Sequence, residues 1–385
     1  MSRWATRKLR ELAHVTGSSA IAALDGPTLL GERAANGGYR IPGLRSAGLG
    51  GSRLMQTADG GWFALTLLRT EDRDLLPALL GCDSDGKLSD EDLAEAVRQW
   101  PCAQIVARAR DLGLPAASAD ELPASVPIAE IAAGQDRQRT DSAHPLVIDL
   151  SAIWAGPLAG HLFWLAGATV IKVESPGRPD LIRRDDPATF DIINQGKASV
   201  LADLANPAQR DALIALIRKA DILIESSRLR ALLHLGIDAN ALVRETPGLV
   251  WLSVTGHGAT GDAAHWTGVG NDCSVAAGIS RAMANAGGEM GYVGDALTDP
   301  LTGITAALEG WKFWSKGRAT RQVLSMSAIG AQALAEEQVF DRAAIDAELK
   351  AWSDGRGLPF PQVARRTLQA PVQPIGADTA QWLPC

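Results

Sequence analysis

Residues 146–175 read LVIDLSAIWAGPLAGHLFWLAGATVIKVES, and this stretch decides the fold class. It opens with a continuous apolar run, 146–151, which is typical of a strand buried on both faces. A helix is expected to begin near Pro157 and to end at Gly167, because proline suits the first helical turn and glycine suits a helix end. A second apolar strand, 169–175, follows. Strand, helix and strand in this order predict a right-handed βαβ unit with parallel strands.

The same alternation continues along the chain. Further strands are expected at 198–204, 221–226 and 249–256, with helical sequence between them. One of these helices has a clear start, because Asn206 is a good N-cap and Pro207 fits the first helical position. We therefore predict an α/β fold, a doubly wound, Rossmann-like parallel sheet.

The N-terminal part of the chain has a different pattern. Glycines crowd residues 43–54, and the Asp-Gly-Gly of 59–61 lies between two apolar runs, which predicts a hairpin. A helix capped by Ser89 and a helix ended by Gly113 follow, so this part is expected to be a small α+β domain. The predicted divisions are a small α+β domain with a glycine-rich loop (1–135), a linker (136–145), a Rossmann-like domain (146–330) and a helical C-terminal tail (331–385).

The composition excludes several classes of protein. With 46% apolar and 21% charged residues, the 385-residue chain resembles an ordinary soluble protein. No apolar run reaches the roughly 18 residues of a membrane span. The net charge of -7 argues against a general nucleic-acid binder. Four cysteines and six histidines without metal-binding spacing predict reduced thiols, a cytoplasmic location and no metal.

An open parallel sheet binds ligands beyond the carboxyl ends of its strands. The turns at these ends contain neither GxGxxG nor GxxxxGK[ST], which disfavours a standard dinucleotide or P-loop site. Arginines recur there instead, at positions 178, 183, 184, 228 and 230. Their spacing suits separate phosphates on an extended ligand, and solvated loop arginines are the alternative interpretation.

Six stretches agree in order and spacing with one known family. They are VIDLSAIWAGPLAGHLFWLAGATVIKVESPGRPD, NQGKASVLADL, KADILIES, LLHLGID, PGLVWLSVTGHGATG and GDALTDPLTG, within about residues 144–330. The chain resembles the class III CoA-transferases, whose superfamily also contains the α-methylacyl-CoA racemases. Residues 46–68 resemble the glycine loop and first hairpin of that family's small domain, which there follows the nucleotide fold. We therefore expect a permuted domain order, and a homodimer whose interlocking the permutation leaves open.

The resemblance implies transfer of CoA from an acyl-CoA thioester to a small carboxylic acid, without a metal. Asp299 matches the family's nucleophile, which forms an aspartyl-CoA thioester through mixed anhydrides. An Asp-Pro before an amphipathic run also starts helices, so we expect a helix at 301–316 whose N-terminus keeps Asp299 ionised. Asp295 is then expected to be a loop residue or a supporting one.

Other site residues are implied in the same way. Ile153 and Trp154 match the turn beneath the thioester, where backbone N–H groups stabilise an oxyanion, although Trp154 also suits an acyl pocket or the core. Gly48, Gly50 and Gly51 match the loop that closes over the intermediate, with a surface turn as the alternative. The expected catalytic residues are Asp299, Trp154 and Gly50. The expected CoA contacts are Ile153, Trp154, Ser175, Arg178, Lys197, Ser226, Ser227 and Arg228.

Two other functions stay open. The racemases use the histidine of a Gly-His-Asp as a base, and the matching residue here is Asn271, which cannot accept a proton from carbon at neutral pH. A non-catalytic paralogue is the second alternative. It is favoured by departures from the family at 226–228, where Glu-Asn-Phe is usual, and at His234, where arginine is common.

Overall fold

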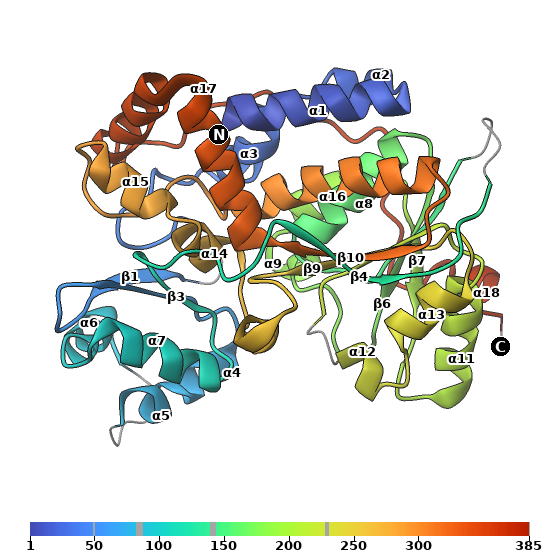
Figure 1. Cartoon of the computed structure of the whole chain (residues 1–385), viewed down its shortest axis with the longest axis horizontal. Helices are drawn as coiled ribbons and strands as arrows, with labels where there is room; N and C mark the ends of the chain where they lie inside the picture. Colours follow the sequence, from blue (N-terminus) through green and yellow to red (C-terminus); the bar gives the residue numbers. More distant parts are fainter. Residues whose placement is uncertain (49–50, 82–87, 139–143, 228–230, 385) are drawn as a thin grey trace.

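The computed structural model describes residues 1–48, 51–81, 88–138, 144–227 and 231–384 (Figure 1). A seven-stranded sheet with helices on both faces forms the larger part, and a three-stranded sheet with its own helices lies beside it. Across the described ranges, no helix combines the length and the apolar character needed to cross a membrane.

The large sheet has the strand order β4-β10-β9-β8-β5-β6-β7. Six of its strands run parallel to their neighbours. They are β5 (Leu146–Asp149), β6 (Thr169–Glu174), β7 (Ala198–Leu201), β8 (Ile222–Glu225), β9 (Val250–Thr255) and β10 (Thr320–Ser325). From β5 the chain builds outward to β7 on one side, and from β8 outward to β10 on the other. The order therefore reverses between β5 and β8, as in a doubly wound Rossmann-type sheet, and the predicted α/β fold is confirmed.

Helices pack on the two faces of this sheet (Figure 1). One face carries α1 (Ser2–Thr16), α8 (Ala155–Leu165) and α16 (Thr298–Ser315), and the other carries α11 (Pro207–Ile217), α12 (Ala231–His234) and α13 (Ala239–Glu245). Neighbouring strand residues point to opposite faces, so Val147 joins the core under α8 and Ile148 joins the core under α11. Asn206 caps α11 as predicted, since its side chain accepts the Ala208 N–H at 3.0 Å.

The small sheet is antiparallel, in the order β1-β2-β3. Its strands are β1 (Arg53–Gln56), β2 (Trp62–Leu65) and β3 (Ala116–Ser118), and its helices are α4 (Thr70–Asp74), α5 (Leu76–Leu80), α6 (Asp90–Val97) and α7 (Cys102–Asp111). The predicted hairpin is present, with Met55 opposite Phe63. Ser89 caps α6 by accepting the Asp92 N–H at 3.1 Å. This unit has its own apolar core, centred on Phe63 and Leu79.

The expected extent of 1–135 for the small domain differs from the structure at both ends. Strand β4 (Ile128–Ala133) pairs antiparallel with β10 and so belongs to the large sheet. Helix α1 packs on α16, because Trp4 and Leu9 belong to the same core as the residues of α16. The helices α2 (Ser19–Ala22) and α3 (Gly26–Asn36) follow α1 on this side. The small unit is therefore limited to about residues 53–118.

The remaining elements connect and close the large part. They are α9 (Ile182–Asp185), α10 (Pro187–Asn194), the 3-10 helix Gly261–His265, α14 (Gly270–Ala276), α15 (Ile279–Asn285), α17 (Met326–Asp354) and α18 (Thr379–Trp382). Helix α17 begins directly after β10 and has a non-helical residue at Asp341. The chain then returns to the far edge of the sheet, where Asp378 accepts the Ser199 N–H of β7 at 2.8 Å.

Candidate active site

A cavity of about 600 Å³ lies at the carboxyl ends of β5 and β8, where the strand order reverses. Three parts of the chain line it: the turns of the large sheet, residues 66–69 of the small unit, and Arg33 of α3. The turns after β5 and β8 are joined, since the Ala152 N–H donates to Ser226 Oγ at 3.3 Å. Asp299 lines the same cavity. This is the position at which sheets of this kind bind ligands.

Asp299 lies inside the first turn of α16 rather than before it. The helix begins at Thr298, three residues earlier than predicted, and its N-cap is Leu297 without a side-chain cap. The carboxyl group is buried, and burial raises its pKa to about 7; the nearby Arg33 lowers the pKa and Asp295 raises it. Our expectation that the helix end keeps Asp299 ionised was therefore wrong. Desolvation outweighs the opposing effect of Arg33, so this carboxyl titrates near neutral pH rather than near 3.8.

Gly270 makes room for this carboxylate. An added Cβ at position 270 would overlap Asp299 Oδ2 and would lie 2.6 Å from the Ala296 Cβ. Residue 270 is the first residue of α14, and with glycine there the start of α14 approaches the start of α16 closely. Nothing in the sequence pattern indicated this requirement, because it arises from the meeting of two helix starts.

Arg33 brings a cation to the cavity from the N-terminal helix α3. Its Nε donates to Asp295 Oδ2 at 2.7 Å and its Nη2 donates to Asp295 Oδ1 at 2.6 Å. Its guanidinium carbon lies 4.4 Å from the centre of the Trp154 ring. Asp295, predicted to be a loop or supporting residue, thus holds Arg33 in a bidentate ion pair. Sequence reasoning missed Arg33, which is separated from Asp295 by 262 positions.

Gly48 lies against the same ion pair. A Cβ at position 48 would be 2.8 Å from Asp295 Oδ1 and 3.0 Å from Arg33 Nη2. The glycine loop predicted to close over the intermediate therefore approaches the site at Gly48. Gly50, which we expected to be catalytic, lies outside the described residues.

The turn at Ile153 and Trp154 reaches the cavity in part, since Ile153 lines it and Trp154 lies in the core, one of the alternatives considered for it. The Ile153 N–H donates to Asp180 Oδ1 at 3.1 Å, so this donor is not free to stabilise an oxyanion. Ile153 has φ 72°, a left-handed conformation that is strained for a β-branched residue. Trp154 is buried in the core and its ring packs on Arg33. Trp154 therefore lies in the core behind Arg33 and does not itself line the cavity.

The turns expected to contact CoA gather at this cavity in part. Arg178, Ser226 and Ser227 line it together with Asp299, and Arg178 is exposed. Ser175 lies beside Arg178, whose N–H donates to the Ser175 carbonyl at 3.1 Å. Arg228 lies outside the described residues. The nucleophile and the candidate phosphate contacts of the sequence prediction thus share one cavity.

Comparison with known proteins also finds a similarity to the CoA-transferases. Residues 143–309 match the profile of CoA-transferase family III. This part of the chain is therefore similar to CoA-transferase family III. The acetyl-CoA:oxalate CoA-transferase of Acetobacter aceti is 31% identical over 164 residues, which are 41% of this chain and 42% of that protein. The succinate–glutarate CoA-transferase of Agrobacterium fabrum is 33% identical over 171 residues, 41% of this chain and 43% of that protein.

The chain thus spans less than half the length of these two family III relatives. A solved structure of a CAIB/BAIF family protein from Brucella suis aligns with 53% of this chain and 59% of its own, at 27% identity and a TM-score of 0.47. The matched residues 143–309 contain Asp299, Asp295 and the turns at 178 and 226, while Arg33 lies outside them.

Lys197, which the family resemblance assigned to CoA, is occupied elsewhere. Its ammonium is buried and donates to Asp149 Oδ2 at 2.8 Å, to the Pro157 carbonyl at 2.8 Å and to Asn194 Oδ1 at 2.9 Å. Burial lowers its pKa to about 8 in spite of Asp149. All three donors of the ammonium are used within the protein, so Lys197 supports the packing beneath the turn and is not free to bind a phosphate.

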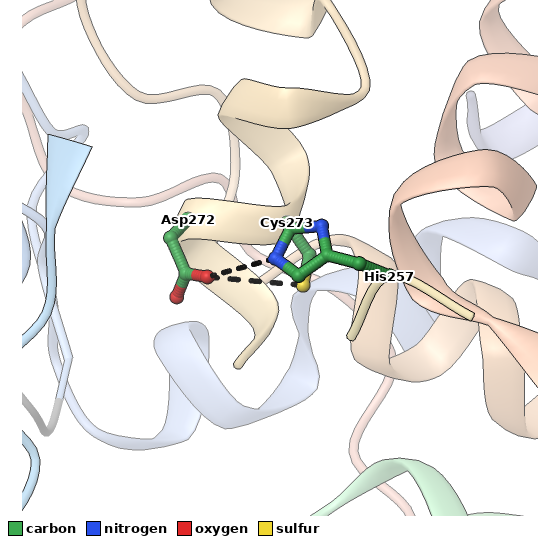
Figure 2. A group of neighbouring side chains, drawn as sticks. All are labelled: His257, Asp272 and Cys273. Atoms are coloured by element: carbon green, nitrogen blue, oxygen red, sulfur yellow. Dashed lines mark hydrogen bonds and ion pairs between the residues drawn. The ribbon is translucent and has the colours of Figure 1, made fainter. Parts of the chain in front are cut away.

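A second polar cluster consists of His257, Asp272 and Cys273 (Figure 2). His257 Nε2 and Cys273 Sγ each lie 3.9 Å from Asp272 Oδ2, and all three side chains are buried. Burial lowers the pKa of His257 to about 3 and raises that of Asp272 to about 7. The Asp272 carboxylate accepts the Val269 N–H at 3.1 Å and the Thr66 hydroxyl at 3.2 Å, which caps α14 and ties it to the small sheet.

These three side chains are also the group among the described residues that offers metal ligands, with all donor atoms within 4.8 Å of one another. The carboxylate already has two hydrogen-bond donors, whereas the buried His257 Nε2 has no hydrogen-bond partner among the described residues. At the position where the racemases have their histidine base, this chain has Asn271. Asn271 is buried and its Oδ1 accepts the Ala296 N–H at 3.1 Å, which holds the loop that leads to Asp299.

Proposed function

We propose that this chain is a CoA-transferase that moves CoA from an acyl-CoA thioester to a carboxylic acid through covalent intermediates on Asp299. One observation carries the proposal. Asp299 lines a single cavity with Arg178, Ser226 and Ser227, at the reversal point of a Rossmann-type sheet. A nucleophilic carboxylate and contacts for a phosphate-bearing ligand are the two parts that this chemistry needs.

The reaction can be written with no external reactant other than the two substrates. The Asp299 carboxylate attacks the thioester carbonyl, the C–S bond breaks, and CoA thiolate leaves behind a mixed anhydride. The thiolate attacks the Asp299 carbonyl carbon, which releases the donor acid as its carboxylate and forms an aspartyl-CoA thioester. The acceptor carboxylate then attacks this thioester, and the CoA thiolate attacks the new acyl carbonyl. These steps release the product thioester and restore the Asp299 carboxylate.

The protonation state of Asp299 sets the working range of this sequence. Only the ionised carboxylate is a nucleophile, and burial raises its pKa to about 7. Adduct formation is therefore expected to increase with pH up to about 8 and then to level off. Arg33 keeps the pKa from rising further, and the Ala155 N–H donates to the carboxylate with the same effect.

The substrate side of the proposal rests on the turns of the sheet. Arg178 is exposed at the cavity and presents a cation to a CoA phosphate, while Ser226 and Ser227 offer hydroxyl groups for hydrogen bonds. Thr66, Leu68 and Arg69 of the small unit also line the cavity and are our candidates for contacts with the acyl group.

We further propose a cytoplasmic homodimer with a permuted domain order. The order is supported by the small sheet, which precedes the Rossmann-type strands along the chain. Sedimentation equilibrium of the full chain tests the dimer, and a monomer at micromolar concentration would contradict it.

Trapping tests the proposed activity. The protein is incubated with acetyl-CoA or succinyl-CoA at pH 8, and mass spectrometry follows a hydroxylamine-sensitive adduct on the peptide that contains Asp299. The adduct is expected in the natural chain and not in Asp299→Asn, with Asp262→Asn, an exposed neighbouring acid, as the matched control. Exchange of the α-proton without an adduct would support a racemase. Absence of both reactions, together with absence of CoA binding, would support a non-catalytic paralogue.

A further inference from the structure

Arg33 is held by an ion pair and a ring contact while it lines the cavity. Its Nε and Nη2 are both used by Asp295, and the Trp154 ring covers the guanidinium at 4.4 Å. The side chain is 6% exposed, and it lines the cavity that contains Asp299. Within the described ranges, no hydrogen-bond partner is found for the remaining nitrogen, Nη1. One edge of a fixed, buried guanidinium is thus left for a ligand in the cavity.

The charges around Arg33 change during the proposed reaction. With Asp299 ionised, one cation (Arg33) faces two carboxylates (Asp295 and Asp299), a net charge of one negative unit. When Asp299 is bound as a thioester it is neutral, and the Arg33–Asp295 pair alone sums to zero. A free carboxylate can then lie beside Arg33 and restore the net charge of the resting site. The departing donor acid and the entering acceptor acid are both free carboxylates at that stage.

From this geometry we propose that Arg33 forms the binding subsite for the carboxylic acid substrate, with Nη1 donating to the acid's carboxylate while Asp299 is covalently occupied. The inference rests on the proposed function and adds to it the location of the second substrate. Asp295 and Trp154 are positioning residues for Arg33, since they fix the plane of the guanidinium. A planar guanidinium is well suited to recognise a carboxylate.

Two features of the chain agree with a built subsite. Gly48 leaves the space around Asp295 Oδ1 and Arg33 Nη2 open, because a Cβ there would lie 2.8 Å and 3.0 Å from these atoms. Arg33 also comes from α3, which is anchored on its other side by an ion pair from Glu32 to Arg366, with Arg366 Nε donating at 2.7 Å. The helix is therefore fixed independently of the cavity. The ion pair of Glu32 also supplies a matched control on the same helix.

The first test measures separately how the Arg33 variants affect the use of each of the two substrates. The enzyme is loaded with acetyl-CoA at pH 9, where Asp299 is ionised, the released acid is removed, and decay of the aspartyl-CoA thioester is followed against succinate concentration. In the double variant Arg33→Gln/Asp295→Asn, which leaves no unpaired buried charge, the half-saturating succinate concentration should rise roughly 10- to 100-fold. The half-saturating acetyl-CoA concentration should change by less than about threefold, since Arg178 and the serine turn are intact. The control Glu32→Gln/Arg366→Gln should change neither value.

The second test does not depend on the chemistry. Succinate is titrated calorimetrically into Asp299→Asn, in which no ionised Asp299 repels the acid, and binding should be tighter than to the natural chain. Adding Arg33→Gln/Asp295→Asn to this variant should weaken binding roughly 10-fold or more. If no adduct forms in the natural chain but succinate binding depends on Arg33, the proposed function fails and the subsite stands. If succinate binding or the succinate dependence of thioester decay is unchanged by the Arg33 variants, the subsite is refuted.

Discussion

Asp299→Asn is expected to stabilise the protein while it removes the proposed activity. Burial raises the pKa of Asp299 from its ordinary value of 3.8 to about 7, a difference of about 3 units. Because each unit corresponds to 1.36 kcal/mol, ionising this carboxyl in the folded protein costs about 4 kcal/mol. Asn has nearly the same shape and cannot ionise, so it avoids this penalty.

The direction in which the free energy of unfolding changes with pH follows from proton binding. Between about pH 4 and pH 7 the folded protein holds the Asp299 proton and the unfolded chain has lost it, so the free energy of unfolding decreases as the pH rises. The variant lacks this decrease. Its advantage over the natural chain should therefore be small near pH 4, grow through pH 5 and 6, and approach about 4 kcal/mol at pH 8.

Urea unfolding of the natural chain and the variant at pH 4.5, 6, 7 and 8 measures this difference. Other buried acids, such as Asp272 with a pKa of about 7, titrate in both proteins and cancel in the comparison. Asp262→Asn, at an exposed position, should give a difference near zero at every pH. A variant that is less stable than the natural chain at pH 8, or a difference that does not depend on pH, would refute the reasoning.

Three further outcomes follow from the site. Gly270→Ala should prevent the Asp299 adduct, measured by mass spectrometry after acyl-CoA treatment, because the new methyl group would overlap the carboxylate. Lys197→Met should lower the free energy of unfolding by roughly 3–5 kcal/mol in urea titrations, since it leaves the Asp149 carboxylate unpaired in the core. It should not change the half-saturating acyl-CoA concentration of the folded fraction. Arg178→Ala should raise that concentration roughly fivefold to tenfold at low salt and less at high salt in steady-state assays, because a surface cation is screened.

Matched variants separate these effects from general damage. Gly177→Ala introduces a methyl group where nothing lies within 4 Å, so the adduct should form as in the natural chain. Arg184→Ala removes a surface arginine that pairs with Asp185, and the acyl-CoA dependence should stay unchanged. A loss of adduct in Gly177→Ala, or equal effects of the two arginine variants, would contradict the assignments.

The Rossmann-type sheet could be predicted because its evidence is local. Continuous apolar runs bounded by turn residues mark strands buried on both faces, and the Asn206-Pro207 pair marks a helix start without reference to the rest of the fold. The boundaries of the small unit could not be predicted in this way. Strand β4 has no fully buried residue, and its identity depends on pairing with β10, about 190 positions further along the chain.

The position of the candidate site was predictable where its residues lie in the turns of the sheet. Asp299 and the serine turn reach one cavity because the carboxyl ends of parallel strands meet at one edge. Arg33 was not predictable, since nothing near it in sequence distinguishes it from the other basic residues of the N-terminal helices. The direction of the pKa shift of Asp299 was predicted wrongly. The helix start is visible in sequence, whereas the burial that overrides it depends on Gly270, Arg33 and Asp295 coming together.

The pairing of Arg33 with Asp295 joins two parts of the chain that can change independently over evolution. If Arg33 holds the acid, the group that performs the transfer lies within residues 143–309 and the group that selects the acceptor lies before them. A changed segment around α3 that keeps the Arg33–Asp295 pair would then redirect the enzyme to another acid without removing the cation beside Asp299. Relatives that agree closely around Asp299 are therefore expected to differ in the acids they accept, and residues outside the shared segment would determine the difference.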